Sequence, residues 1–350
     1  MTTPPIERVT AWMVVLPLRT AFASARTRIH ERRLVLIQVC AGEHTGWGEA
    51  APVPGHTAEN IDDIWERFTG AETPGGFGDV PGLLGAARDE AYADLAARQS
   101  SLALWRVHGG TRPVPASAAV GLNDAGDPDR RVVESAAAAG YRFAKLKVTQ
   151  HTKPLAVAAL VADYPQLRFG ADANGSMTPG NENLLKELDE LGLEYLEQPG
   201  PADDIDWHVR LRSSLTMPVS LDEGADSPEK VRRIVASGAA DIVNLKVSRF
   251  GPRQTLQLAD EVVAAGLRVR IGGLIESGIG RAHSVAVAAH DHFSVVGDIA
   301  GSDRFFDDDL VRPQWRVHDG LLSLPESPGI GVEVDKEAVA AHAVASLSIP

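Results

Sequence analysis

Ionisable residues recur at a regular interval in the part of the chain that follows Pro115. Short apolar runs alternate there with Ala- and Leu-rich amphipathic stretches, and successive runs end in an ionisable residue. The intervals are 25, 25, 25 and 24 positions for the set Lys147, Asp172, Glu197, Asp222 and Lys246. Strand–helix units repeated about eight times are typical of a (β/α)8-type barrel, in which the carboxyl ends of the strands form the active-site rim. A doubly wound open sheet is the alternative α/β fold.

The predicted elements divide the chain into three parts. Residues 1–112 combine predicted strands at 9–16, 33–40 and 45–49 with predicted helices at 60–68 and 83–99, which indicates a small α+β domain. Residues 113–320 carry the barrel pattern, and residues 321–350 form a tail that we expect to pack back on the first domain. The predicted barrel strands lie at 116–121, 143–148, 168–173, 195–198, 219–222, 242–247, 269–273 and 293–296. The predicted helices between them include 130–139, 155–164, 181–191, 228–237, 252–265 and 278–289.

Three of the recurring residues are carboxylates that end three adjacent predicted strands: Asp172, Glu197 and Asp222. Carboxylates that converge at one rim repel one another unless a cation neutralises them. A charged ligand set made of oxygen alone suits Mg²⁺ or Mn²⁺ better than zinc. Taken singly, a carboxylate after a strand is more often a helix N-cap than a metal ligand. The recurrence of one per repeat favours a metal site.

The lysines of the set lie on the second and sixth predicted strands, which are opposite each other in an eight-stranded barrel. Lys147 and Lys246 would therefore face each other across the metal. Lys145 and Lys147 point to the same side of one strand, and a second ammonium next to a divalent cation lowers the pKa of a lysine. A lysine of lowered pKa can remove the proton α to a carboxylate, and the cation stabilises the resulting enediolate. Taken singly, each lysine is a solvated loop residue.

Several motifs together resemble the enolase superfamily, in its muconate cycloisomerase-like branch. They are Lys145-x-Lys147, Asp172-Ala173-Asn174, Glu197-Gln198-Pro199, Leu221-Asp222-Glu223, Asn244-Leu245-Lys246, the stretch 272–278 and Trp47-Gly48-Glu49-Ala50. The resemblance covers almost the whole chain and implies an N-terminal capping domain on a modified TIM barrel of (β/α)7β type. It also implies Mg²⁺ bound by Asp172, Glu197 and Asp222, and an acid–base pair formed by Lys147 and Lys246. Lys145 would assist the pair, and Asn174 and Gly273 would contact the substrate.

Within this branch the C-terminal half is most similar to o-succinylbenzoate synthase and N-succinylamino-acid racemase, on the stretches 272–281 and 297–305. The resemblance therefore implies a Mg²⁺-dependent lyase of the menaquinone pathway, which dehydrates its substrate, or a racemase. Dipeptide epimerases carry Asp-x-Asp at the last strand, and Asp298-Ile299-Ala300 lacks the second aspartate. A dipeptide epimerase or a cycloisomerase stays open as the alternative. The intact set of carboxylates and lysines disfavours a non-catalytic scaffold.

Substrate choice is expected to reside in two loops of the first domain, at 20–32 and 52–57. Four arginines in and beside the first loop, Arg26, Arg28, Arg32 and Arg33, could bind a distal carboxylate such as that of a succinyl group. We predict that Arg26 and Arg28 contact the substrate. A solvated basic loop is the equally weighted alternative.

Composition excludes several other functions. The 34 Lys and Arg residues against 47 Asp and Glu give a net charge of −13, which argues against binding to nucleic acid or to an anionic membrane. A single cysteine, Cys40, excludes an internal disulfide and any multi-cysteine metal site. The sequence has no signal-peptide pattern and no apolar run of membrane-spanning length, so we expect a cytoplasmic enzyme that acts on a small-molecule carboxylate. A homo-oligomer is compatible with the sequence, which leaves the oligomeric state open.

Overall fold

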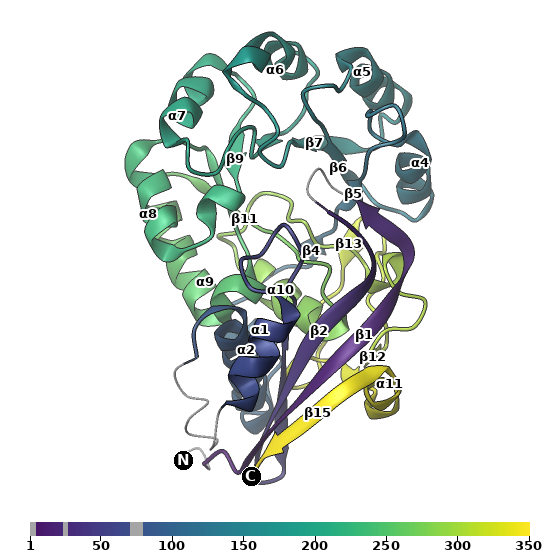
Figure 1. Cartoon of the computed structure of the whole chain (residues 1–350), viewed down its shortest axis with the longest axis vertical. Helices are drawn as coiled ribbons and strands as arrows, with labels where there is room; N and C mark the ends of the chain where they lie inside the picture. The colour runs from purple at the N-terminus through teal and green to yellow at the C-terminus, as the bar shows by residue number, and fades with distance from the viewer. Residues whose placement is uncertain (1–4, 24–26, 71–79) are drawn as a thin grey trace.

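The computed structural model describes residues 5–23, 27–70 and 80–350. One part of it is an antiparallel sheet with the strand order β15-β1-β2-β3. β1 (Arg8–Ala23) and β2 (Arg28–Ala41) form a long hairpin, β3 (His44–Ala50) extends it, and α1 (Ile61–Thr69) and α2 (Gly82–Gln99) complete the domain. Gly48 lets α2 lie directly on β3, because a Cβ atom there would be 1.9 Å from the carbonyl oxygen of Ala87. This is the expected α+β capping domain (Figure 1).

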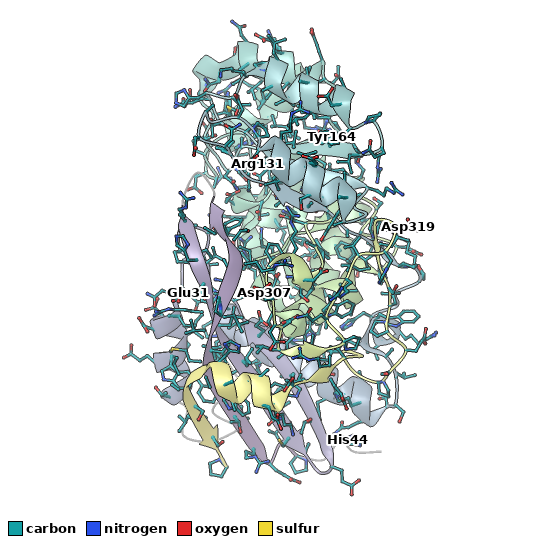
Figure 2. The ribbon with its side chains drawn as sticks, turned by 90° about the vertical axis from the view of Figure 1, so that its right-hand side faces the viewer. Glu31, His44, Arg131, Tyr164, Asp307 and Asp319 are labelled. Atoms are coloured by element: carbon teal, nitrogen blue, oxygen red, sulfur yellow. The ribbon has the colours of Figure 1, made fainter. Side chains whose placement is uncertain are left out.

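The C-terminal segment returns to this sheet from the far end of the chain. α11 (Lys336–His342) leads into β15 (Ala343–Ile349), and β15 pairs antiparallel with β1, with Val9 opposite Ile349. Figure 2 shows the yellow strand lying along the purple hairpin with α11 beside it. The first and last strands of the protein are therefore neighbours in one sheet.

The second part is a parallel sheet of seven strands in the order β11-β10-β9-β8-β7-β6-β5. The strands are β5 (Ala118–Val120), β6 (Phe143–Lys147), β7 (Arg168–Asp172), β8 (Leu196–Glu197), β9 (Val219–Leu221), β10 (Ile242–Leu245) and β11 (Arg268–Ile271). The helices that follow them are α4 (Arg130–Ala138), α5 (Pro154–Asp163), α6 (Glu182–Asp189), α7 (Ile205–Ser214), α8 (Pro228–Ser237), α9 (Val247–Ala264) and α10 (Gly278–Ala288). Strand order equals chain order, as in a barrel, and the predicted fold class is confirmed.

Shorter elements join these parts. They are α3 (Leu104–Val107), β4 (Val114–Pro115), β12 (Val311–Arg312), β13 (Leu321–Leu322), β14 (Glu333–Val334) and the 3₁₀ turns Pro179–Asn181, Glu223–Ala225 and Ser302–Arg304. No helix in the described ranges 5–23, 27–70 and 80–350 is both long enough and apolar enough to cross a bilayer.

The predicted eighth strand at 293–296 is wrong, because this stretch has no strand conformation. The gap between β11 and β5 is bridged further along the chain by two single backbone bonds. The amide of Asp298 donates to the carbonyl of Ile271 at 2.7 Å, and the amide of Ser117 donates to the carbonyl of Ile299 at 3.0 Å. Isolated bonds of this kind do not make a ladder, so no eighth strand forms at 293–299.

Two other boundaries differ from prediction. The predicted loop at 20–32 is largely hairpin, since β1 continues to Ala23 and β2 already begins at Arg28. The helix predicted at 252–265 is preceded by a further helical stretch at 247–250, and the two stretches of α9 meet at Gly251, where φ is 74° and ψ is 163°. Glycine adopts this non-helical conformation without strain, so the chain changes direction there and a separate helical stretch begins at Pro252.

Buried carboxylates at the boundary between the two parts make stability depend on pH. Burial raises the pKa of Glu49 from 4.5 to about 7, and it raises the pKa of Glu90 well above 4.5. Glu90 accepts a hydrogen bond from the amide of Glu49 at 2.9 Å, while its other oxygen has no hydrogen-bond partner in the described part of the chain. A folded-state pKa above the unfolded value adds stability that is complete below the unfolded pKa and is lost as the pH rises through the folded pKa.

We therefore expect the free energy of unfolding to fall as the pH rises from about 4.5 to 7, by roughly 3 kcal/mol from Glu49 alone. Glu90 adds to the fall. The variant Glu90→Gln removes one titrating group and should reduce the difference between urea unfolding at pH 5 and at pH 8. Glu66→Gln, at an exposed position of the same domain, is the control and should keep the wild-type difference. An unchanged pH dependence in Glu90→Gln would contradict the assignment.

Candidate active site

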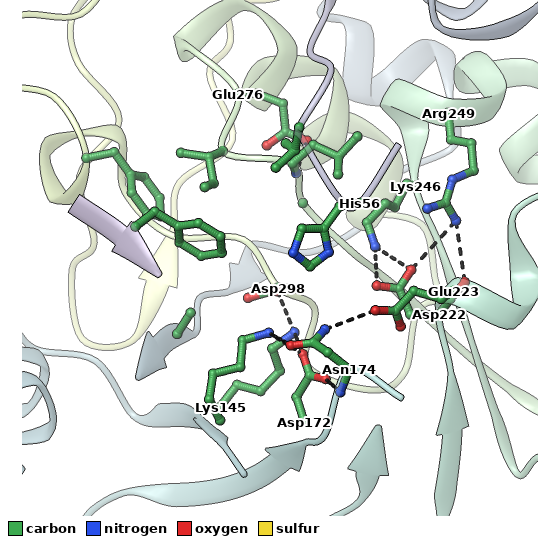
Figure 3. A pocket seen from close by; sticks show the side chains of 18 of the residues that line it. His56, Lys145, Asp172, Asn174, Asp222, Glu223, Lys246, Arg249, Glu276 and Asp298 are labelled. Atoms are coloured by element: carbon green, nitrogen blue, oxygen red, sulfur yellow. Dashed lines mark hydrogen bonds and ion pairs between the residues drawn. The ribbon is translucent and has the colours of Figure 1, made fainter. Parts of the chain in front are cut away.

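A pocket lies at the carboxyl ends of the barrel strands, under the capping domain. The barrel supplies the charged and polar lining of the pocket: Lys145, Lys147, Asp172, Asn174, Asp222, Glu223, Lys246, Arg249, Glu276, Arg281 and Asp298. Apolar and capping-domain groups close the other side: Phe22, Val53, His56, Ala119, Gly273, Leu274, Ile275 and Phe305. Figure 3 shows Lys145 and Lys246 on opposite sides of the pocket, with His56 between them. A polar, buried floor therefore faces a largely apolar roof.

Lys145 lies among three carboxylates. Its Nζ is 2.9 Å from Asp172, 3.0 Å from Glu197 and 2.6 Å from Asp298. Burial alone would lower the pKa of Lys145, but the charges of the three carboxylates outweigh it and hold that pKa well above its usual value. The sequence predicts a lowered pKa for a lysine beside a second ammonium and a bound divalent cation, whereas in this structure the three carboxylates pair directly with Lys145.

Lys147 contacts the next strand at its carboxyl end. Its Nζ donates to Asp172 at 2.7 Å and to the side-chain oxygen of Asn174 at 2.7 Å. The amide of Asn174 donates to the other oxygen of Asp172 at 2.9 Å, in a left-handed backbone conformation with φ 45° that asparagine tolerates. Burial would raise the pKa of Asp172, but Lys145 and Lys147 outweigh it and hold that pKa far below its usual value. Asp172 is therefore ionised.

Lys246 contacts the third carboxylate on the far side of the barrel. It follows β10, which is four strands away from β6 in the sheet, and its Nζ donates to both oxygens of Asp222. Burial would raise the pKa of Asp222, but Lys246 and Arg249 outweigh it and hold that pKa well below its usual value. Lys147 and Lys246 thus approach the pocket from opposite sides, each paired with a carboxylate.

Glu197 lies deepest and is held by three donors. Besides Lys145, Arg270 donates to it at 2.6 Å and the amide nitrogen of the Asn244 side chain at 2.7 Å. Arg270 is fully buried with its guanidinium over the ring of Tyr195, 4.4 Å from the ring centre. Both oxygens of Glu197 are therefore hydrogen-bonded inside the barrel, without contact with solvent.

Asp172, Glu197 and Asp222 are the side chains expected to bind a divalent cation. In the described residues no three His, Cys, Asp or Glu side chains are grouped so that they could hold a metal ion as they stand. Instead, Lys145 bridges Asp172 and Glu197, and Lys246 neutralises Asp222. These three are ionised or charge-paired oxygen ligands on neighbouring strands, which is the ligand chemistry that Mg²⁺ prefers. The residues fit the ion in type and in strand position, provided that the ammonium groups give way to it.

The other predicted contacts divide into two groups. Lys145, Asn174 and Gly273 line the pocket, and a Cβ at Gly273 would be 2.7 Å from the carbonyl oxygen of Asp298. Arg26 lies outside the described residues. Arg28 is exposed in β2 and is not among the residues that line the pocket.

Sequence reasoning missed Asp298, Arg270 and His56. Asp298 follows the apolar run at 293–296, so the rule that found the other carboxylates also applied to it. Arg270 alternates with Val269 and Ile271 inside a strand, and this pattern is equally typical of a half-exposed strand. His56 comes from the predicted specificity loop at 52–57 and lines the pocket, although no motif marks it.

Known proteins resemble this chain in sequence and in structure. The family model described as "Enolase C-terminal domain-like" matches residues 129–339. An o-succinylbenzoate synthase from Bacillus subtilis is 32% identical over 95% of each chain, and an N-succinylamino acid racemase from Thermus thermophilus is 35% identical over 70% of this chain and 67% of its own. A solved member of the enolase superfamily from Listeria innocua superposes with a TM-score of 0.90 at 26% identity, over 99% of both chains.

Proposed function

Because the chain belongs to the enolase superfamily and is an enzyme of the lyase or racemase type, we propose that it removes the proton α to a carboxylate, with Lys147 and Lys246 as the acid–base pair. The observation that carries the proposal is the placement of these two buried lysines on opposite sides of one pocket. A planar enediolate bound between them exchanges a proton on either face. One lysine removes the proton and the other delivers it in racemisation.

We further propose that Asp172, Glu197 and Asp222 hold Mg²⁺. The ion supplies positive charge beside the substrate carboxylate, which favours the enediolate. Lys145 adds a second positive charge beside the ion and orients the substrate carboxylate, since its Nζ lies among Asp172, Glu197 and Asp298 at the edge of the pocket. Arg270 and Asn244 keep Glu197 in place. Asn174 positions Lys147 through its side-chain oxygen.

The proposed substrates follow from the relatives. Proteins that are 28–35% identical carry the names o-succinylbenzoate synthase and N-succinylamino acid racemase. We propose the same chemistry here, the dehydration that yields o-succinylbenzoate, the racemisation of N-succinylamino acids, or both. The apolar roof formed by Phe22, Leu274 and Phe305 is suited to the hydrocarbon part of such a molecule.

The test is incubation of the Mg²⁺-loaded protein with each enantiomer of several N-succinylamino acids in D₂O, followed by NMR of the α-proton. The compound whose dehydration yields o-succinylbenzoate and a series of dipeptides are assayed in parallel. Exchange of the succinyl compounds, faster than exchange of the dipeptides, is expected. Faster dipeptide exchange would favour an epimerase, and the absence of exchange and dehydration with every compound would sink the proposal.

A further inference from the structure

Two fully buried, oppositely charged side chains of the capping domain contact one wall of the pocket. Arg32 of β2 is 1% exposed and donates three hydrogen bonds to carbonyl oxygens: to Leu274 at 3.1 Å, to Ile275 at 3.1 Å and to Pro52 at 2.8 Å. Leu274 and Ile275 line the pocket, and Pro52 precedes the lining residue Val53. The guanidinium thus joins a barrel loop to a capping-domain loop. Arg32 is therefore no substrate contact, unlike the distal-carboxylate role considered for it from the sequence.

Glu49 of β3 holds the same wall from the neighbouring strand. It is 0% exposed, and its carboxylate accepts hydrogen bonds from the amide of Ser277 at 2.9 Å, the amide of Gly280 at 3.2 Å and the hydroxyl of Ser277. Ser277 is the N-cap of α10, so Glu49 satisfies amides at the start of that helix. The two charged groups fasten both ends of the short segment 274–280.

The segment needs such fastening, because its backbone is not in a relaxed conformation. Ile275 has φ 56°, in the left-handed region that a β-branched side chain disfavours. Inside the segment, Glu276 accepts a hydrogen bond from the amide of Leu274 at 2.8 Å. A strained residue stays in such a conformation only when its surroundings hold it there. The carbonyl of Ile275, fixed by Arg32, is the direct restraint.

We propose that Arg32 and Glu49 are positioning residues that set substrate selectivity by holding the pocket wall at 274–277 in place. This inference rests on the proposed function. Neither side chain is among the residues that line the pocket, so neither touches the reacting atoms. The lysines perform the proton transfer, whereas the wall determines which substrate side chain fits against Leu274 and Ile275.

The test uses two conservative variants of the full-length protein. Arg32→Lys keeps the charge but loses the planar fork that reaches two carbonyls, and Glu49→Gln keeps the shape but loses one acceptor. The KM and kcat values are measured for the N-succinyl derivatives of alanine, valine and phenylalanine. We expect KM for the best substrate to rise about tenfold, with kcat within about threefold of wild type, and the kcat/KM ratios among the three to move toward one.

The matched control is Asp94→Asn. Asp94 is also a fully buried capping-domain carboxylate that accepts from backbone amides, those of Trp47 and Ile330, but it makes no hydrogen bond to the wall. The substitution Asp94→Asn should lower the melting temperature of the protein and leave the kcat/KM ratios among the three substrates unchanged. Wild-type selectivity in both Arg32→Lys and Glu49→Gln would overturn the inference, as would an equal change in Asp94→Asn. If the wild-type protein neither exchanges these compounds nor catalyses the dehydration, the proposed function has failed, which is a separate result.

Discussion

Treatment with EDTA is expected to abolish turnover, and addition of Mg²⁺ or Mn²⁺ is expected to restore it. The buried floor holds Asp172, Glu197 and Asp222, whose charges are balanced by lysines in the structure. Without a divalent cation, those lysines stay paired with the carboxylates, so their positive charge is not available to bind the substrate carboxylate. Full activity in the metal-free protein would show that the reaction does not require a metal ion.

A single substitution tests the ligand set. Asp222→Asn removes one charged ligand, so we expect Mg²⁺ affinity, measured by titration calorimetry without substrate, to fall steeply and turnover to be lost. The control is Asp226→Asn, four residues further along, since Asp226 is an exposed aspartate that pairs with Lys230. The Asp226→Asn variant should bind Mg²⁺ with the same affinity as the wild-type protein. Circular dichroism and a melting curve check that Asp222→Asn remains folded. Unchanged Mg²⁺ affinity in that variant would show that Asp222 is not a ligand.

Loss of either opposed lysine should stop proton exchange for one enantiomer only. Each lysine approaches one face of the substrate, so Lys147→Ala should block exchange of one enantiomer in D₂O and Lys246→Ala should block the other. The expected loss is about 10²–10⁴-fold, the usual contribution of a general base. NMR of the α-proton, with each variant against each enantiomer, measures it. Lys153→Ala, at a largely exposed lysine paired with Asp127, is the control and should exchange both enantiomers.

A syn dehydration gives a different pattern with the same variants. One lysine would remove the proton and protonate the leaving hydroxide, while the other stabilises the enediolate by its charge or by a cation–π contact. One lysine variant would then no longer catalyse the dehydration at all. The other variant would catalyse it more slowly, with no preference for either enantiomer. Wild-type exchange of both enantiomers in both lysine variants would rule out the opposed-lysine mechanism.

The sequence by itself determined the repeat and the residues at the strand ends. Strand and helix periodicity are local properties, and parallel strands in chain order bring their carboxyl ends to one rim. The spacing of Lys147, Asp172, Glu197, Asp222 and Lys246 was therefore enough to predict that they gather in one place. All except Glu197 line the pocket, and Glu197 lies just beneath it, bonded to Lys145.

Only the tertiary structure decided which partner each of these charges has. Lys145 lies between carboxylates from two strands and a loop, and these carboxylates hold its pKa above the usual value. Arg32 and Arg28 belong to the same predicted basic loop, yet one is fully buried against a barrel loop some 240 residues away and the other is exposed. The local composition and the local sequence pattern are the same around Arg28 and Arg32. What separates them is the approach of segments far apart in sequence, which determines burial and charge pairing and is not encoded in any local period.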